Sequence, residues 1–188
     1  MNLDLIDNKY LKSTLPPNFR KKSRVSSDPF VVREILATTT PATKILDVGP
    51  GSGKYGYYLR QHRLVDAVEI FPDYVTIYGL ERIYNRVYIS DIRNFDVSPY
   101  DYIIYGDIAE HLPVTDFQRL LEQHNQLGQQ VLVVFPWLYE QDILENNPAE
   151  IHHQPDLTPA VVAERYPSLT MIYYSKLTGV YVNNITHK

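Results

Sequence analysis

A glycine-rich segment preceded by an acidic residue is the part of this chain whose residue types point to ligand chemistry. It runs from Ile45 to Gly53 and reads Ile-Leu-Asp-Val-Gly-Pro-Gly-Ser-Gly. Its three glycines tolerate positive φ and allow close approach to a ligand, and a following helix would direct free N–H groups into the turn. We expect a ligand-binding corner in which Asp47 attracts an ammonium or sulfonium group and would repel a diphosphate.

Residue spacing separates the glycine motifs that compete for this segment. A Walker phosphate loop needs glycine where Val48 stands and Ser or Thr where Tyr55 stands. The dinucleotide pattern G-x-G-x-x-G is met from Gly51 to Gly56, but the strand would then run through Gly49-Pro50 and the acidic residue would have no role. A nicotinamide-binding oxidoreductase is therefore the less favoured alternative.

The segment resembles the first motif of class I S-adenosylmethionine-dependent methyltransferases, in which an acidic residue and G-x-G-x-G end the first strand. A second feature agrees: Glu69 ends the next predicted strand, where a carboxylate can accept hydrogen bonds from both ribose hydroxyls of a nucleoside. The resemblance implies S-adenosyl-L-methionine as cofactor. It assigns to the cofactor site Asp47, Gly49, Pro50, Gly51, Gly53, Glu69, Ile70, Asp91, Ile92 and Asp107.

Two later segments extend the resemblance. Asp91 would meet the adenine amino group and Ile92 would pack on the base, although Asp91 also fits an ordinary loop or capping acid. The segment from Asp107 to Leu112 resembles the acid-x-x-Glu-His-Leu stretch that many small-molecule methyltransferases carry after strand four. It implies that Asp107 borders the methionine end of the cofactor. Glu110 and His111 could also simply be polar residues that stabilise the loop.

Alternation of strands and helices predicts the fold class. We expect an α/β, Rossmann-like, doubly wound sheet of seven mainly parallel strands with a terminal antiparallel hairpin. The predicted strands are 44–48, 64–70, 86–89, 100–105, 129–135, 169–174 and 180–183, and the predicted helices are 29–40, 53–62, 72–84, 114–127 and 159–166. Residues 1–28 are expected to form an N-terminal arm and residues 29–188 a single methyltransferase domain.

The polar loop at 136–157 is the expected acceptor site, because a connection of this length inside a compact domain is usually functional. Its stretch from Asn147 to His152 resembles the Asn-Pro-x-x-x-His stretch that some members of the superfamily carry after strand five. A hydroxyl or amine acceptor must lose a proton. We take His152 and His111 as the candidate catalytic residues, with His153 and the carboxylates Glu110 and Glu150 as alternatives.

Missing residue types narrow the chemistry. The chain has no cysteine, which excludes the covalent cytosine-C5 mechanism. The end of strand four lacks the Asn/Asp-Pro-Pro-Tyr/Phe of amino-directed nucleic-acid methyltransferases. Phe135-Pro136-Trp137 lacks the acidic pair of magnesium-dependent catechol-type enzymes, so no metal is expected. These observations favour a small-molecule O- or N-methyltransferase, with a non-catalytic protein that binds S-adenosylmethionine or S-adenosylhomocysteine as the alternative.

Composition bears on partners and location. A net charge of −4 does not indicate a broad nucleic-acid footprint, so no nucleic-acid partner is expected. No stretch of the sequence approaches a membrane span, and the absence of cysteine gives no sign of secretion, so a cytoplasmic protein is expected. The tyrosine-rich terminal hairpin offers an edge through which two copies could form a homodimer.

Overall fold

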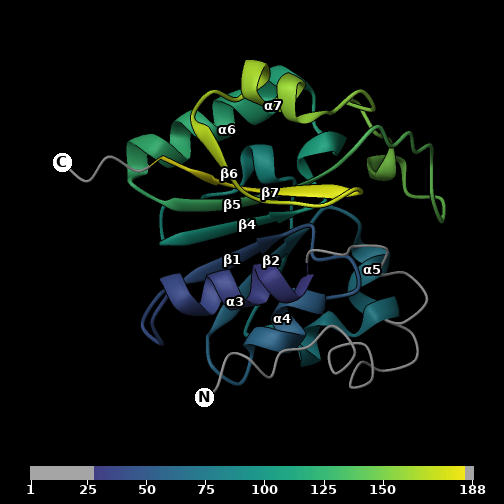
Figure 1. Ribbon diagram of the computed structural model, residues 1–188. Helices are drawn as coiled ribbons and strands as arrows, with labels where there is room; N and C mark the ends of the chain where they lie inside the picture. The colour runs from purple at the N-terminus through teal and green to yellow at the C-terminus, as the bar shows by residue number, and fades with distance from the viewer. Residues whose placement is uncertain (1–27, 185–188) are drawn as a thin grey trace.

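The computed structural model describes residues 28–184, and the predicted arm at 1–28 lies outside them except for its last residue. Seven strands form one sheet (Figure 1): β1 (Ile45–Val48), β2 (Val65–Glu69), β3 (Val87–Ile89), β4 (Tyr102–Gly106), β5 (Gln130–Pro136), β6 (Leu169–Tyr174) and β7 (Thr178–Asn183). Their order is β3-β2-β1-β4-β5-β7-β6. The first five are parallel, and β7 runs antiparallel to both β5 and β6. The predicted fold class is confirmed.

Helices cover both faces of the sheet (Figure 1). On one face lie α3 (Asp28–Thr38), α4 (Lys54–Leu59) and α5 (Pro72–Tyr78), and on the other lie α6 (Val114–Leu127) and α7 (Pro159–Arg165). Four short 3₁₀ turns complete the described elements: η2 (Leu80–Arg82), η3 (Ile92–Asn94), η4 (Ala109–His111) and η5 (Pro148–Glu150). Helix α6 was predicted residue for residue.

Two helices are shorter than the sequence predicted. The helix expected to run from 72 to 84 stops at Tyr78, because Gly79 adopts a left-handed conformation with φ 62° and closes it as a C-cap. The chain then continues through η2 and reaches Tyr84 outside any helix. Similarly, α4 ends at Leu59 instead of residue 62, so the helix after the glycine turn has only 6 residues.

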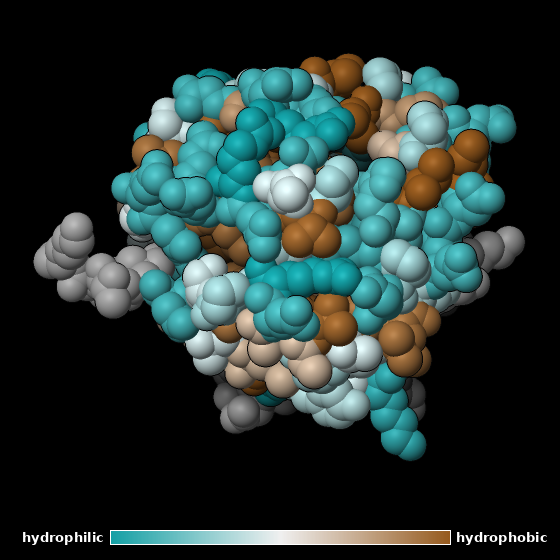
Figure 2. Space-filling view, turned by 90° about the horizontal axis from the view of Figure 1, so that it is seen from above, coloured by the Kyte–Doolittle hydropathy of each residue, from teal (hydrophilic) through white to brown (hydrophobic). Residues whose placement is uncertain are grey.

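The sheet separates two hydrophobic cores. On the α6–α7 side, aromatic rings pack in series: Phe117 meets Tyr105 and Tyr166 edge to face, and Phe135 stacks on Tyr166 at 5.7 Å. On the other side, α3, α4 and α5 bury residues such as Ile35 and Leu59 against the same strands. The outer surface above α6 and α7 is mainly hydrophilic, with apolar side chains in small separate groups (Figure 2). The buried parallel strands of such a sheet provide a rigid base for a site at its edge.

The carboxyl ends of the five parallel strands all meet at one edge of the sheet. The strand order reverses between β1 and β4, and ligands of open α/β sheets bind at such a switch point. The loop between β5 and α7 reaches the same edge and is pinned there by hydrogen bonds to η4. Among residues 28–184, no helix is both long enough and apolar enough to cross a lipid bilayer.

Candidate active site

A cavity of about 470 Å³ opens at the carboxyl ends of the parallel strands. Its size is in the usual range for sites that bind small molecules and cofactors. It is bordered by the turns that follow β1, β2, β3 and β4 and by the loop after β5. The lining residues used below are Gly49, Gly51, Glu69, Ile70, Asp91, Ile92, His111, Glu150 and His153. Six of the ten residues expected to contact the cofactor therefore lie around one cavity.

The glycine turn needs its glycines for two different reasons. Gly49 has φ 57°, and a Cβ there would come within 2.2 Å of Ile108 Cδ1. Gly51 has φ 51°, but no atom lies within 4 Å of where its Cβ would stand. The space over Gly51 is therefore open to the cavity, and its backbone is accessible to a ligand. Gly49 instead allows close packing of the turn on the segment after β4.

Asp47 does not line the cavity. It is 1% exposed, lies beneath the glycine turn, and accepts a hydrogen bond from the Tyr84 hydroxyl at 2.5 Å. Burial raises the pKa of Asp47 to about 7, although Tyr84 and Lys54 both act to lower that pKa. The sequence led us to expect this carboxylate to face a cationic group, whereas here it holds the turn in place from below.

Glu69 does line the cavity, at the end of β2. Its Oε1 accepts a hydrogen bond from Phe71 N at 2.9 Å, and the side chain is 3% exposed. Burial is the main cause that raises the pKa of Glu69 to about 7, and the charge of Glu150 across the cavity adds to it. The neighbouring Ile70 is 44% exposed and offers an apolar surface to a ligand.

Asp91 lies in the cavity wall, and its carboxylate is already bound by Arg93. Asp91 Oδ1 accepts a hydrogen bond from Arg93 N and so caps η3, while the Arg93 guanidinium pairs with both carboxylate oxygens at 2.9 and 3.0 Å. The guanidinium lowers the pKa of Asp91. Arg93 also reaches Asp116 at 3.2 Å, which ties the turn to α6. Ile92 is 7% exposed and lines the same wall.

Three residues of the predicted cofactor set lie outside the cavity wall, besides Asp47. Pro50 is buried within the turn, and Gly53 packs where a Cβ would meet Ile83 and Leu80 at 2.9 and 3.0 Å. Asp107 has φ 60°, an uncommon conformation for a residue with a side chain, and its Oδ2 lies 3.6 Å from Lys54 Nζ. Pro50, Gly53 and Asp107 therefore support the segments that border the cavity, without lining it themselves.

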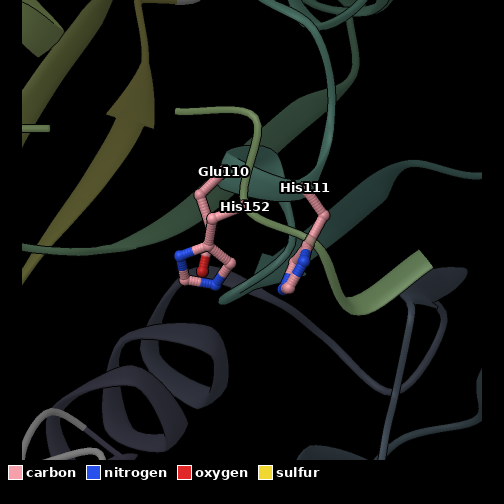
Figure 3. Close-up of side chains that lie close together, drawn as sticks. All are labelled: Glu110, His111 and His152. Carbon is pink, nitrogen blue, oxygen red and sulfur yellow. The ribbon is translucent and has the colours of Figure 1, made fainter. Parts of the chain in front are cut away.

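The two candidate catalytic histidines meet although they are far apart in the sequence. Their rings lie edge to face with centroids 4.5 Å apart (Figure 3). His111 Nδ1 is 3.3 Å from Ile151 O, and His152 Nδ1 is 2.6 Å from Tyr139 O. A carbonyl can only accept, so each Nδ1 carries the proton and each Nε2 keeps its lone pair.

Burial lowers the pKa of both imidazoles, that of His111 to about 4. Both rings are therefore neutral at physiological pH. His111 lines the cavity, whereas His152 contacts the His111 ring without lining the cavity.

Gln154 is a buried residue of the site that the sequence did not reveal. Its Nε2 donates to Ala109 O and Leu112 O, each at 3.0 Å, and its Oε1 accepts from the Tyr166 hydroxyl at 2.7 Å. The backbone of Glu110 accepts two further hydrogen bonds from the same segment, from residues 153 and 154. The loop carrying His152 is thereby fastened to η4, which carries His111.

Comparison with known proteins identifies the family. Residues 30–142 match the family model described as "Methionine biosynthesis protein MetW". The chain belongs to the MetW family. The matched part of this MetW-family chain includes β1 to β5 and with them the glycine turn, Glu69, Asp91 and η4. No curated protein matches the chain in sequence.

Solved structures show the fold at low sequence identity. A DhpI–SAH complex is 14% identical, with a TM-score of 0.68 over 96% of this chain and 95% of that one. A SAM-dependent methyltransferase from Aquifex aeolicus is 17% identical, with a TM-score of 0.58 over 92% and 100%. An RNA methyltransferase from Salinibacter ruber in complex with S-adenosyl-L-homocysteine is 18% identical, with a TM-score of 0.53 over 87% and 95%. The chain thus has the fold of class I methyltransferases.

Proposed function

We propose that this protein is an S-adenosylmethionine-dependent methyltransferase that acts on a small-molecule O or N acceptor. The observation that carries the proposal is the placement of Glu69 and Gly51 in one cavity at the carboxyl ends of β2 and β1. A carboxylate at this position can accept hydrogen bonds from both hydroxyls of a ribose, and an unobstructed glycine backbone lets the rest of the ligand pass closely.

Different residues of the cavity would contact the ribose, the adenine and the methionine part of the cofactor. Glu69 would hold the ribose, and Asp91 and Ile92 would border the adenine. The turn at Gly49 and Gly51 would lie along the methionine part, with Asp107 nearby. The cofactor itself supplies an electrophilic methyl on a sulfonium sulfur. The protein's part is to bind and orient it and to exclude water.

The acceptor side is formed by η4 and the loop after β5. His111 and His152 each present a neutral imidazole with a free Nε2, the form that can take up a proton from the methyl acceptor. Glu69 and Glu150 line the cavity, and Glu110 is buried next to His111. A polyanionic acceptor would meet the acidic side chain of Glu150, whereas a small neutral or cationic acceptor would not be repelled.

The proposal is tested by following a radiolabelled methyl group from the cofactor into fractions of extract from the source organism. We expect label in the small-molecule fraction, and slower transfer by His111→Gln and His152→Gln with unchanged affinity for S-adenosylhomocysteine. The matched control is His62→Gln, which removes an imidazole outside the site and should transfer like wild type.

Other results would contradict parts of the proposal. Label in the RNA or protein fraction would contradict a small-molecule acceptor. Binding of S-adenosylhomocysteine without transfer into any fraction would contradict catalysis and identify a binding protein. Binding of NAD in place of S-adenosylhomocysteine would contradict the cofactor.

A further inference from the structure

Glu110 holds a buried carboxyl group that the protein leaves incompletely satisfied. The side chain is 1% exposed, and its Oε2 has no hydrogen-bond partner among the described residues. Leaving a buried carboxylate oxygen without a partner is costly, so such a group needs an explanation. Burial raises the pKa of Glu110 well above the usual range, and the negative charges of Asp107 and Glu150 raise it further, so these neighbours supply no explanation.

Two imidazoles face this carboxyl. Glu110, His111 and His152 each offer one ligand atom, and the three atoms lie within 4.8 Å of one another. In Figure 3 one nitrogen of each ring points toward the other ring, and the Glu110 carboxyl lies behind His152. Both Nδ1 atoms are directed at backbone carbonyls, the arrangement by which proteins orient histidines that bind metals through Nε2.

We propose that Glu110, His111 and His152 form a binding site for a divalent first-row transition metal. Two imidazoles and one carboxylate suit borderline cations such as Zn²⁺, Mn²⁺, Fe²⁺ or Co²⁺ better than Mg²⁺ or Ca²⁺, which prefer oxygen ligands alone. Ligands about 2.1 Å from one ion are at most about 4.2 Å apart. Small side-chain rotations therefore bring the three ligand atoms to a single cation.

The local charge favours the same conclusion. The carboxylates of Asp107, Glu110 and Glu150 act on one another at this place, and Lys54 is the basic group that opposes them. A divalent cation would stabilise the ionised form of Glu110 and would give its free oxygen a partner. The sequence led us to expect no metal because no acidic pair follows strand five. The ligands come instead from the end of β4 and from the loop that is fastened to it.

A role for the metal follows from its position and rests on the proposed function. Three protein ligands leave coordination positions open, and His111 borders the cofactor cavity. With each Nε2 on the cation, the two histidines would act as ligands and not as bases. An acceptor hydroxyl bound there would lose its proton to water more readily, because the cation lowers its pKa. The acceptor oxygen would then form the new bond to the methyl carbon, while the carbon–sulfur bond breaks and the sulfur keeps its electron pair. The site thus favours an oxygen acceptor.

The test is titration of the purified, chelator-treated protein with Co²⁺, read from its visible d–d absorption and from calorimetry. We expect one Co²⁺ per chain, and no competition from Mg²⁺ at the same concentration. Glu110→Gln, His111→Gln and His152→Gln should each weaken Co²⁺ binding at least tenfold. His153→Gln is the matched control: it removes the adjacent, exposed imidazole, and Co²⁺ binding should be unchanged.

The result that would overturn the proposal is Co²⁺ binding that is absent in wild type, or lost equally in His153→Gln. Thermal unfolding of each variant without metal keeps the test valid, because a folded variant that fails to bind is informative. Binding of S-adenosylhomocysteine is measured separately on the same samples. If it fails while Co²⁺ binds, the proposed function is wrong and the metal site stands. If it binds and Co²⁺ does not, the reverse holds.

Discussion

The hydroxyl of Tyr84 donates a hydrogen bond of 2.5 Å to the carboxylate of Asp47, beneath the glycine turn. The same hydroxyl accepts a hydrogen bond from Gly56 N at 3.3 Å, so one phenol joins β1, α4 and the segment after η2. Both side chains are buried. Tyr84 therefore acts as a positioning residue for the turn that borders the cavity, without lining that cavity itself.

Replacing Tyr84 with Phe removes this hydroxyl and leaves the buried Asp47 carboxyl without its donor. We expect the free energy of unfolding to fall by about 1–3 kcal/mol, measured by urea denaturation. Tyr174→Phe, at a side chain that is 59% exposed, is the matched control and should change stability by less than about 0.5 kcal/mol. Equal stabilities for the two variants would show that the hydrogen bond does not support the turn.

Gly56→Ala tests the close packing of α4 on the same tyrosine. Alanine in place of glycine normally stabilises a helix by about 1 kcal/mol. Here the new Cβ would lie 2.3 Å from Tyr84 Cε1, in a ring that its hydrogen bonds hold in place. We expect a net loss of about 1–3 kcal/mol in a chemical denaturation experiment, as for other overpacked sites. A more stable Gly56→Ala variant would contradict this packing.

The contribution of Glu69 to the stability of the ligand-free protein should fall as pH rises from about 4.5 to 7, in the opposite direction to that of the buried histidines, whose pKa values are lowered. The pKa of Glu69 is raised from 4.5 to about 7, so the folded state holds a proton that the unfolded state releases. Its contribution is fully present below the unfolded pKa and is lost as pH passes the folded pKa. A shift of this size corresponds to at most about 3 kcal/mol. Asp47 adds a loss of the same sign.

Glu69→Gln should remove the Glu69 share of this pH dependence. We expect unfolding experiments at several pH values to show the variant gaining stability relative to wild type as pH rises, so that it is the more stable of the two near pH 8. Glu81→Gln, at an exposed acid, should keep the wild-type profile. If Glu69→Gln also keeps it, the carboxyl titrates normally in the folded protein.

Gln154→Leu tests how the loop after β5 is fastened to η4. The substitution leaves Ala109 O, Leu112 O and the Tyr166 hydroxyl without their buried partner. We expect a loss of about 2–4 kcal/mol in unfolding free energy, since unsatisfied buried groups cost about 1–3 kcal/mol each and relax in part. Gln123→Leu on the exposed side of α6 serves as the control. A loss no larger than in that control would mean that other contacts hold the loop.

The parts of the site that follow directly after strands were predictable from sequence. Gly51, Glu69 and Asp91 each follow or end a parallel strand, and the carboxyl ends of such strands meet at one edge of the sheet. Local sequence signals also marked the ends of helices. Pro72 begins α5, and Gly128 ends α6 in a left-handed conformation. The premature end of α5 at Gly79 was missed because a lone glycine inside an apolar pattern is not decisive.

Relationships between distant residues could not be predicted in this way. Tyr84 is separated from Asp47 by the whole of α4, β2 and α5, and no local pattern indicates that its hydroxyl reaches that carboxylate. The meeting of His152 with His111 likewise depends on the path of the loop after β5. Burial, which determines the direction of each pKa shift here, depends on the packed structure and not on the sequence pattern.

Titration calorimetry with S-adenosylhomocysteine tests most directly whether Glu69 holds the ribose of S-adenosylmethionine or its product. We expect wild type to bind, Glu69→Ala to lose about 1.5–3 kcal/mol, roughly ten- to a hundredfold in affinity, and the exposed-acid control Glu81→Ala to bind like wild type. Equal affinities for wild type and Glu69→Ala, or no binding by wild type, would contradict the account.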